Sequence, residues 1–155
     1  MASFNVAKPV QMLLVEDNPS DVRLMREALK ETSLPIVITV ARDGVEAMDL
    51  LHKIESGQGV RPDLVLLDLN LPRKNGHEVL SEVKTSPGLR SIPVLVMTSS
   101  KAEDDVNQAY MLNANGYITK PSDLLEYIHI VRAIEQFWFF TVTLPEPVSG
   151  SVTVH

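Results

Sequence analysis

The sequence predicts an α/β fold built on a doubly wound, five-stranded parallel sheet. Five short apolar stretches alternate with five amphipathic stretches along the chain, and this order is typical of parallel sheets with right-handed connections. Some of these stretches, such as residues 64–67 and 94–97, are apolar at every position. Such runs are typical of strands that helices cover on both faces of the sheet.

The first two strand–helix units begin near the N-terminus. Residues 12–15 form the first expected strand, and Asn18 and Pro19 suit the N-cap and the first position of a helix. The β-branched residues 36–40 predict the second strand, and residues 43–46 are a capping-box variant that opens the second helix. Apolar residues recur at helical spacing in these two helices, namely Val22, Met25 and Leu29, then Ala47, Leu50, Leu51 and Ile54.

Three further strands follow. Residues 64–67 are the third strand, and residues 75–78 repeat the cap pattern before a third helix. Residues 94–97 are the fourth strand, and residues 100–103 form a full capping box before the next helix. Residues 117–119 are a short fifth strand.

Ser122 is expected to cap a last helix that runs to about residue 138. We divide the chain into an N-terminal extension (1–10), one domain (11–136) and an apolar C-terminal tail (137–155). A length of 155 residues suffices for one domain with its own core, and we expect no separate output domain.

Composition excludes several kinds of site. The chain has no cysteine, which rules out disulfides, thiolate metal sites and a cysteine nucleophile. Its four histidines lack the spacing of metal ligands. The net charge of −6 argues against binding along a nucleic-acid backbone, and the apolar runs are too short for a membrane span. Because the N-terminus also lacks a signal-peptide pattern, we expect a cytoplasmic protein with neither nucleic acid nor a membrane as partner.

Polar side chains follow four of the five expected strands. In chain order they are Glu16 and Asp17, Asp68, Thr98, and Lys120. The carboxyl ends of parallel strands meet at one edge of an open α/β sheet, where ligands bind. We therefore expect three carboxylates, a hydroxyl and an ammonium group to lie together at this edge.

These groups are suited to moving a phosphoryl group onto a carboxylate. Two like charges about 4 Å apart cost roughly 4 kcal/mol at an effective dielectric constant of about 20, so three carboxylates need positive charge nearby. Lys120 supplies one charge, and Mg²⁺ typically binds one or two carboxylates together with a phosphate. A carboxylate can then attack phosphorus while metal, ammonium and hydroxyl groups stabilise the transferring oxygens.

The chain resembles the response-regulator receiver domains of two-component signalling. The resemblance covers about residues 11 to 136. It depends on four motifs, which are VEDN at 15–18, LLDLNLPRKNG at 66–76, VMTSS at 96–100 and YITKP at 117–121. It implies the flavodoxin-like topology of this family, with strand order 2-1-3-4-5.

The resemblance also implies roles for the acidic residues. Asp68 would be the phosphoacceptor. Asp17, Asp68 and the backbone carbonyl of Asn70 would bind Mg²⁺ or Mn²⁺, with Glu16 acting through water. The protein would catalyse its own phosphorylation and slow dephosphorylation, and it would signal by protein–protein contact.

The other motif residues would form the phosphoryl-binding switch. Thr98 would hydrogen-bond the phosphoryl group, Lys120 would pair with it, and the small Ser99 would leave access open. Tyr117 occupies the position of the aromatic residue that turns inward on activation. The Lys120–Pro121 peptide bond would be cis, as is common in the family.

The last helix and the tail carry more apolar residues than one buried face requires, and such an excess suggests a partner or a self-interface. This ending resembles the small response regulators paired with cyanobacterial phytochromes. It implies a phytochrome-type sensor histidine kinase as donor and a homodimer through the last strand, last helix and tail. The dimer candidates are Ile130, Ile134, Phe137, Trp138, Phe139 and Phe140. The alternative is a tail folded back on its own domain.

Three other functions compete with this interpretation. A haloacid-dehalogenase-type phosphatase needs a second Asp two residues after its nucleophile, as a general acid, and this chain has Asn70 there. A flavodoxin-like cofactor protein needs a hydroxyl- and glycine-rich loop after the first strand, where Glu16 and Asp17 would repel an anion. A constitutive dimeric adaptor that is never phosphorylated would keep the same fold.

Overall fold

The computed structural model describes residues 9–139 and contains a five-stranded, all-parallel sheet. The strands lie in the order β2-β1-β3-β4-β5, so the predicted fold and strand order are confirmed. Their bounds are β1 Val10–Val15, β2 Ile36–Ala41, β3 Leu64–Leu67, β4 Val94–Thr98 and β5 Gly116–Thr119. Each predicted strand is present, and only the ends differ by one or two residues.

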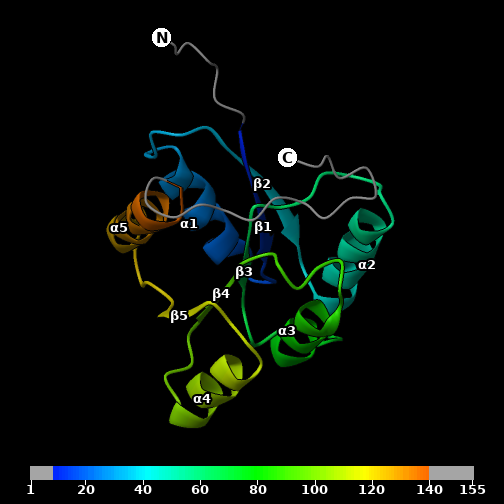
Figure 1. Cartoon of the computed structure of the whole chain (residues 1–155). Helices are drawn as coiled ribbons and strands as arrows, with labels where there is room; N and C mark the ends of the chain where they lie inside the picture. The colour runs from blue at the N-terminus through cyan, green and yellow to red at the C-terminus, as the bar shows by residue number, and fades with distance from the viewer. Residues whose placement is uncertain (1–8, 140–155) are drawn as a thin grey trace.

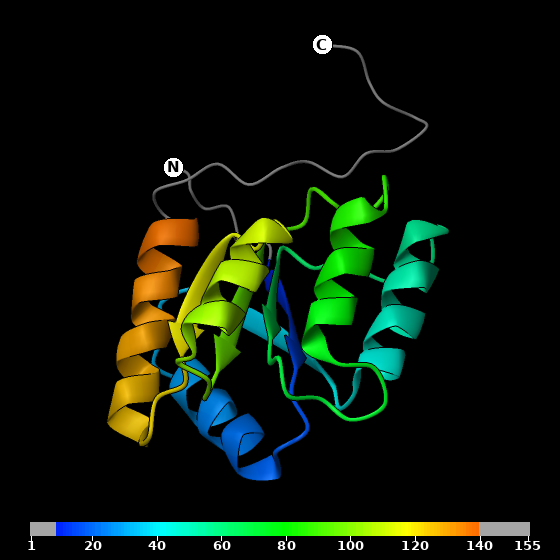
Figure 2. The ribbon, with the colours of Figure 1, turned by 90° about the horizontal axis from the view of Figure 1, so that it is seen from below.

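Five α-helices lie among residues 9–139 and cover the sheet. They are α1 Pro19–Leu29, α2 Gly44–Glu55, α3 Gly76–Thr85, α4 Glu103–Met111 and α5 Leu124–Ile134, and a π-helical turn, η1 Glu135–Phe139, continues α5. Helices α1 and α5 lie side by side on one face of the sheet, and α2, α3 and α4 lie on the other (Figures 1 and 2). No helix among residues 9–139 is long and apolar enough to cross a membrane.

Strand periodicity divides the core into two apolar clusters. In β1, Leu13 and Val15 pack toward α2 and α3, while Met12 and Leu14 pack toward α1 and α5. β3 and β4 alternate in the same way. Because successive side chains point to opposite faces of the sheet, a strand that is apolar throughout must be covered by helices on both faces. Strands β3 and β4 are accordingly buried at every position.

Three of the predicted helix starts are confirmed. The Asn18 side chain accepts hydrogen bonds from the backbone of the first turn of α1, with Pro19 at the first helical position. Asp43 accepts a bond from the Glu46 amide at the start of α2. Asn75 forms a complete capping box with Glu78 at the start of α3.

The starts of α4 and α5 differ from the sequence prediction. The N-cap of α4 is Ala102, with no side-chain cap, because the Ser100 hydroxyl donates to Asp105 and accepts from the Ala102 amide instead. The N-cap of α5 is Asp123 rather than Ser122. The Ser122 hydroxyl instead donates to Glu126 Oε1 at 2.7 Å.

The C-terminal segment 134–139 packs largely on its own domain. Ile134 is buried in the α1/α5 cluster, and Trp138 and Phe139 pack against that cluster, partly buried. Phe137 is 52% exposed. The prediction that Ile134 lies at a dimer surface is therefore wrong, because the helix phase turns it inward. Phe140 and the rest of the tail lie outside the described residues.

Candidate functional site at the carboxyl ends of the strands

The structure brings the predicted polar residues to one edge of the sheet. The backbone ladder continues past the strand ends: the Asp68 amide donates to the Val15 carbonyl at 3.1 Å, and the Lys120 amide donates to the Thr98 carbonyl at 2.8 Å. These bonds hold the residues after β3 and β5 in register with the neighbouring strands. Glu16, at the end of β1, is held in the same way by β2.

Three carboxylates form an acidic cluster at this edge. Ligand atoms of Glu16, Asp17 and Asp68 all lie within 4.8 Å of one another. Glu16 and Asp68 are 3% and 4% exposed, whereas Asp17 is exposed to solvent. Burial raises the pKa of Glu16 to about 7; a hydrogen bond from Lys120 opposes this rise, and the charge of Asp68 adds to it. Such an all-oxygen cluster, buried on one side and open on the other, fits a hard divalent cation.

Lys120 is the cation of the site. Its ammonium group lies 2.8 Å from Glu16 Oε1, 2.8 Å from Asp21 Oδ2 and 3.0 Å from Asp68 Oδ2. Burial alone would lower the pKa of Lys120, but hydrogen bonds to Asp21, Glu16 and Asp68 outweigh it and hold that pKa above its ordinary value. The group therefore stays charged at neutral pH and offsets part of the carboxylate repulsion.

Asp21 belongs to the site, and the sequence interpretation missed it. It lies in the first turn of α1, where its Oδ2 pairs with Lys120 and its Oδ1 accepts a hydrogen bond from the Tyr127 hydroxyl of α5 at 3.2 Å. The helical spacing contained a signal for it. Asp21 stands four residues before Met25, a core residue of α1, and residues four apart share a helix face.

Thr98 presents an unused hydroxyl. Its side chain is fully buried, and its Oγ1 has no hydrogen-bond partner among the described residues. A buried polar atom without a partner costs free energy, so this hydroxyl is available to an oxygen anion at the site. Ser99, the next residue, is exposed.

Tyr117 of β5 reaches the loop that follows β4. Its hydroxyl donates to the Ser100 carbonyl oxygen at 3.0 Å, and its ring packs against the α2/α3/α4 cluster. Burial raises the pKa of Tyr117. The residue thus connects β5 to the backbone beside Thr98, at the position expected for the switch aromatic.

The loop after β3 folds tightly over Asp68. The Asn70 amide donates to Asp68 Oδ1 at 3.2 Å. A Cβ atom added at Gly76 would lie 2.3 Å from the Asp68 carbonyl oxygen and 2.5 Å from Leu69 Cα. Only glycine therefore fits at the start of α3 beside the backbone of Asp68.

The expected cis bond at Lys120–Pro121 is absent, since residues 9–139 contain no cis peptide bond. A trans bond is the lower-energy form before proline by about 0.5–1 kcal/mol. With this bond trans, Lys120 still reaches all three carboxylates.

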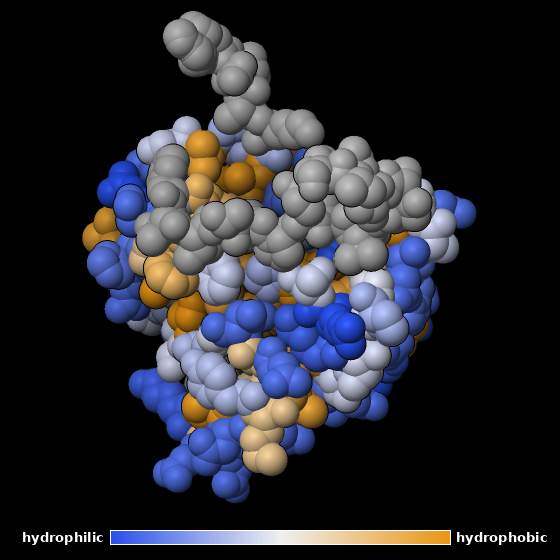
Figure 3. Space-filling model, viewed as in Figure 1, coloured by the Kyte–Doolittle hydropathy of each residue, from blue (hydrophilic) through white to orange (hydrophobic). Residues whose placement is uncertain are grey.

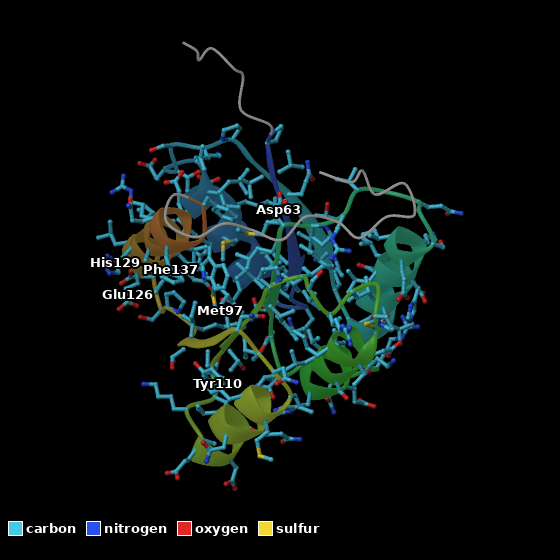
Figure 4. All side chains as sticks on the ribbon, viewed as in Figure 1. Asp63, Met97, Tyr110, Glu126, His129 and Phe137 are labelled. Carbon is cyan, nitrogen blue, oxygen red and sulfur yellow. The ribbon has the colours of Figure 1, made fainter. Side chains whose placement is uncertain are left out.

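A cleft of about 900 Å³ opens beside the site. It runs between the start of α1, the loop after β4 and helix α5. Its lining includes Asp21, Ser99, Lys101, Lys120, Glu126 and His129. Figure 4 places Glu126 and His129 on α5. Lys120 is therefore accessible from this cleft.

Comparison with known proteins agrees with this geometry. The family model "Response regulator receiver domain" matches residues 12–132. The chain is 47% identical over 138 residues to the response regulator Rcp1 of Synechocystis sp., covering 88% of this chain and 94% of Rcp1. It is 40% identical to the probable methanogenesis regulatory protein FilR2 of Methanothrix harundinacea, covering 90% of each chain.

Solved structures show the same likeness. The phosphorylated cyanobacterial phytochrome response regulator RcpA superposes with a TM-score of 0.83 at 47% identity, over 90% of this chain and 100% of RcpA. The Mn²⁺-bound form of Rcp1 superposes with a TM-score of 0.79 at 46% identity, over 89% of this chain and 100% of that one. The resemblance to phytochrome-associated response regulators is thus confirmed, and the chain belongs to the response regulator receiver domain family.

Proposed function

We propose that this protein accepts a phosphoryl group on Asp68 from a sensor histidine kinase, in a reaction that depends on a divalent metal. The observation that carries the proposal is the position of the Lys120 ammonium, within 3.0 Å of a buried Asp68 carboxylate. The neighbouring Glu16 and Asp17 complete an acidic cluster. A buried carboxylate with a fixed cation and an unused hydroxyl nearby is equipped to receive an anionic group.

The reaction forms one bond and breaks another. A carboxylate oxygen of Asp68 attacks phosphorus, an O–P bond forms, and the P–N bond to the donor imidazole breaks. Lys120 pairs with one phosphoryl oxygen, and the Thr98 hydroxyl donates to another. Mg²⁺ or Mn²⁺, bound by Glu16, Asp17, Asp68 and the Asn70 carbonyl, would supply the remaining positive charge.

Thr98 and Tyr117 are suited to report the phosphoryl group to the surface. The Thr98 hydroxyl has no partner among the described residues, so a hydrogen bond to a phosphoryl oxygen would draw it toward Asp68. Tyr117 already contacts the Ser100 carbonyl in the same loop. Movement of this loop would alter the start of α4 and the surface formed by α4, β5 and α5, where Tyr110 is half exposed (Figure 4).

The proposed donor is a phytochrome-type sensor histidine kinase, with both proteins in the cytoplasm. Support comes from relatives: RcpA, at 47% identity, is described as a cyanobacterial phytochrome response regulator, and AtBRR, at 39% identity, as a bacteriophytochrome response regulator. The protein would then signal by contact with a partner.

A homodimer through β5, α5 and the C-terminal segment remains part of this proposal, with a smaller set of residues. Phe137 is exposed, and Ile130, Trp138 and Phe139 are only partly buried. On the face seen in Figure 3, apolar residues are interspersed with hydrophilic ones around α4 and α5. In the proposed dimer these small apolar patches and the tail, residues 137–155, together form the self-interface.

Intact mass after incubation with acetyl phosphate tests the phosphoacceptor. We expect one phosphoryl group to be gained in the presence of Mg²⁺, none in EDTA, and none in Asp68→Asn, which is nearly isosteric and keeps the fold. Asp63→Asn is the matched control, because Asp63 precedes the same strand at its opposite end (Figure 4). Full labelling of Asp68→Asn would remove the assignment. No labelling of the wild type by acetyl phosphate or by a phosphorylated phytochrome-type kinase would favour the passive adaptor.

A further inference from the structure

Lys120 has no spare hydrogen to offer a phosphoryl group. A lysine ammonium has three N–H donors and no acceptor. Three carboxylate oxygens, on Glu16, Asp21 and Asp68, already lie at 2.8–3.0 Å from it. A phosphoryl oxygen that pairs with Lys120 must therefore displace one of these three acceptors.

Asp21 is the acceptor that stands apart from the other two. Glu16 and Asp68 belong to the acidic cluster, and Glu16 Oε2 also accepts the Asn18 amide. Asp21 is not part of that cluster of three. It belongs to α1, and its side chain, 20% exposed, lines the cleft beside Lys120.

Asp21 is also held in place from the other side. Its Oδ1 accepts the hydroxyl of Tyr127, a residue that is 1% exposed in the α1/α5 cluster. The Tyr127 ring cannot move without disturbing that cluster. Asp21 is thus fixed with one oxygen toward Lys120. A phosphoryl group that pairs with Lys120 must compete with this oxygen for the ammonium group.

We propose that Asp21 is a positioning residue that competes with the phosphoryl group for Lys120 and so slows the loading of Asp68. This inference rests on the proposed function. When Asp68 is loaded, Lys120 exchanges its bond to Asp21 for a bond to the phosphoryl oxygen. The negative charge of Asp21 in the cleft also opposes the approach of an anionic donor.

The test compares rates of loading by acetyl phosphate with Mg²⁺, in which the Asp68 O–P bond forms and acetate leaves. Asp21→Asn keeps the shape and a carbonyl acceptor but removes the charge. We expect the second-order rate constant of loading to rise on the order of threefold to tenfold, the scale expected for one unit charge in a partly solvated site.

Two matched variants separate competition from a loss of structure. Asp21→Glu keeps the charge and should restore a rate close to that of the wild type. Asp49→Asn removes an equal charge from the exposed side of α2 and should leave the rate unchanged. Circular dichroism melting of each variant confirms that the fold is retained.

The outcomes are distinct. Faster loading of Asp21→Asn, with rescue by Asp21→Glu, supports the inference. Unchanged or slower loading of a folded Asp21→Asn overturns it while leaving Asp68 as the acceptor, since slower loading would mean that Asp21 merely holds Lys120 in place. A wild type that gains no phosphoryl group overturns both the proposed function and this inference.

Discussion

The sequence predicted a function both for the acidic edge of the sheet and for the C-terminal segment that includes residues 134–139. The structure bears out the expected positions of the side chains at the edge but not at Ile134 in the segment. At the edge, Glu16, Asp17, Asp68, Thr98 and Lys120 come together as expected. In the segment, Ile134 is buried, and Trp138 and Phe139 pack on the domain's own core.

The difference lies in what positions the side chains. A residue directly after a parallel strand is held by the strand's own hydrogen-bond ladder, so its place follows from the strand assignment alone. A residue on the last helix is placed by the helix phase and by the neighbours available for packing. An apolar excess on a helix therefore indicates burial without indicating which surface buries it.

The edge is expected to tolerate backbone change very poorly. Gly76→Ala would place a Cβ atom 2.3 Å from the Asp68 carbonyl oxygen, and the backbone would have to shift. We expect a loss of about 3 kcal/mol in the free energy of unfolding, together with slower loading of Asp68. Chemical denaturation measures the first and intact mass the second.

Gly57→Ala is the matched control for that change. Unlike Gly76, Gly57 has a positive φ, 94°, and no atom lies within 4 Å of an added Cβ. Strain in its backbone alone should cost about 1 kcal/mol and should leave loading unchanged. Equal losses for the two variants would show that the close approach at Asp68 is unimportant.

Two residues of the C-terminal segment are expected to respond differently to substitution, because Ile134 is buried and Phe137 is exposed. Ile134→Ala should lower the free energy of unfolding by about 2–3 kcal/mol, because it leaves a cavity in the α1/α5 cluster. Phe137→Ala should change stability by less than about 0.5 kcal/mol but weaken self-association in sedimentation experiments. Sedimentation of Phe137→Ala identical to the wild type at micromolar concentrations would argue against a dimer through this segment.

A smaller effect than that of Ile134→Ala is expected at Glu135, the buried acid of the segment. Its Oε2 accepts the Leu34 amide at 2.6 Å and ties η1 to the loop before β2. Glu135→Gln keeps an acceptor but loses the charge that strengthens this bond, so we expect a loss of about 1 kcal/mol in denaturation experiments. A more stable variant would mean that burying the charge costs more than the bond contributes.

Sequence patterns predicted those site residues whose positions follow from neighbouring residues in the chain, and missed those whose positions depend on distant residues. Asp68 and Lys120 follow apolar strands, and Asn75 with Glu78 forms a capping box within four residues. Asp21 was missed because its partners, Lys120 and Tyr127, are 99 and 106 residues away along the chain. The start of α4 was misplaced because Ser100 bonds to Asp105 instead of capping the helix.

Local patterns therefore predicted the strands and the polar residues that follow them, since the period of a strand is a property of the chain itself. The strand order followed from the family motifs. Tertiary packing decided which carboxylates share Lys120 and which face of the last helix is buried. It also left the start of α4 without the side-chain cap that Ser100 was expected to provide. Those outcomes depend on contacts between distant segments, whose free energies exist only once the helices have packed on the sheet.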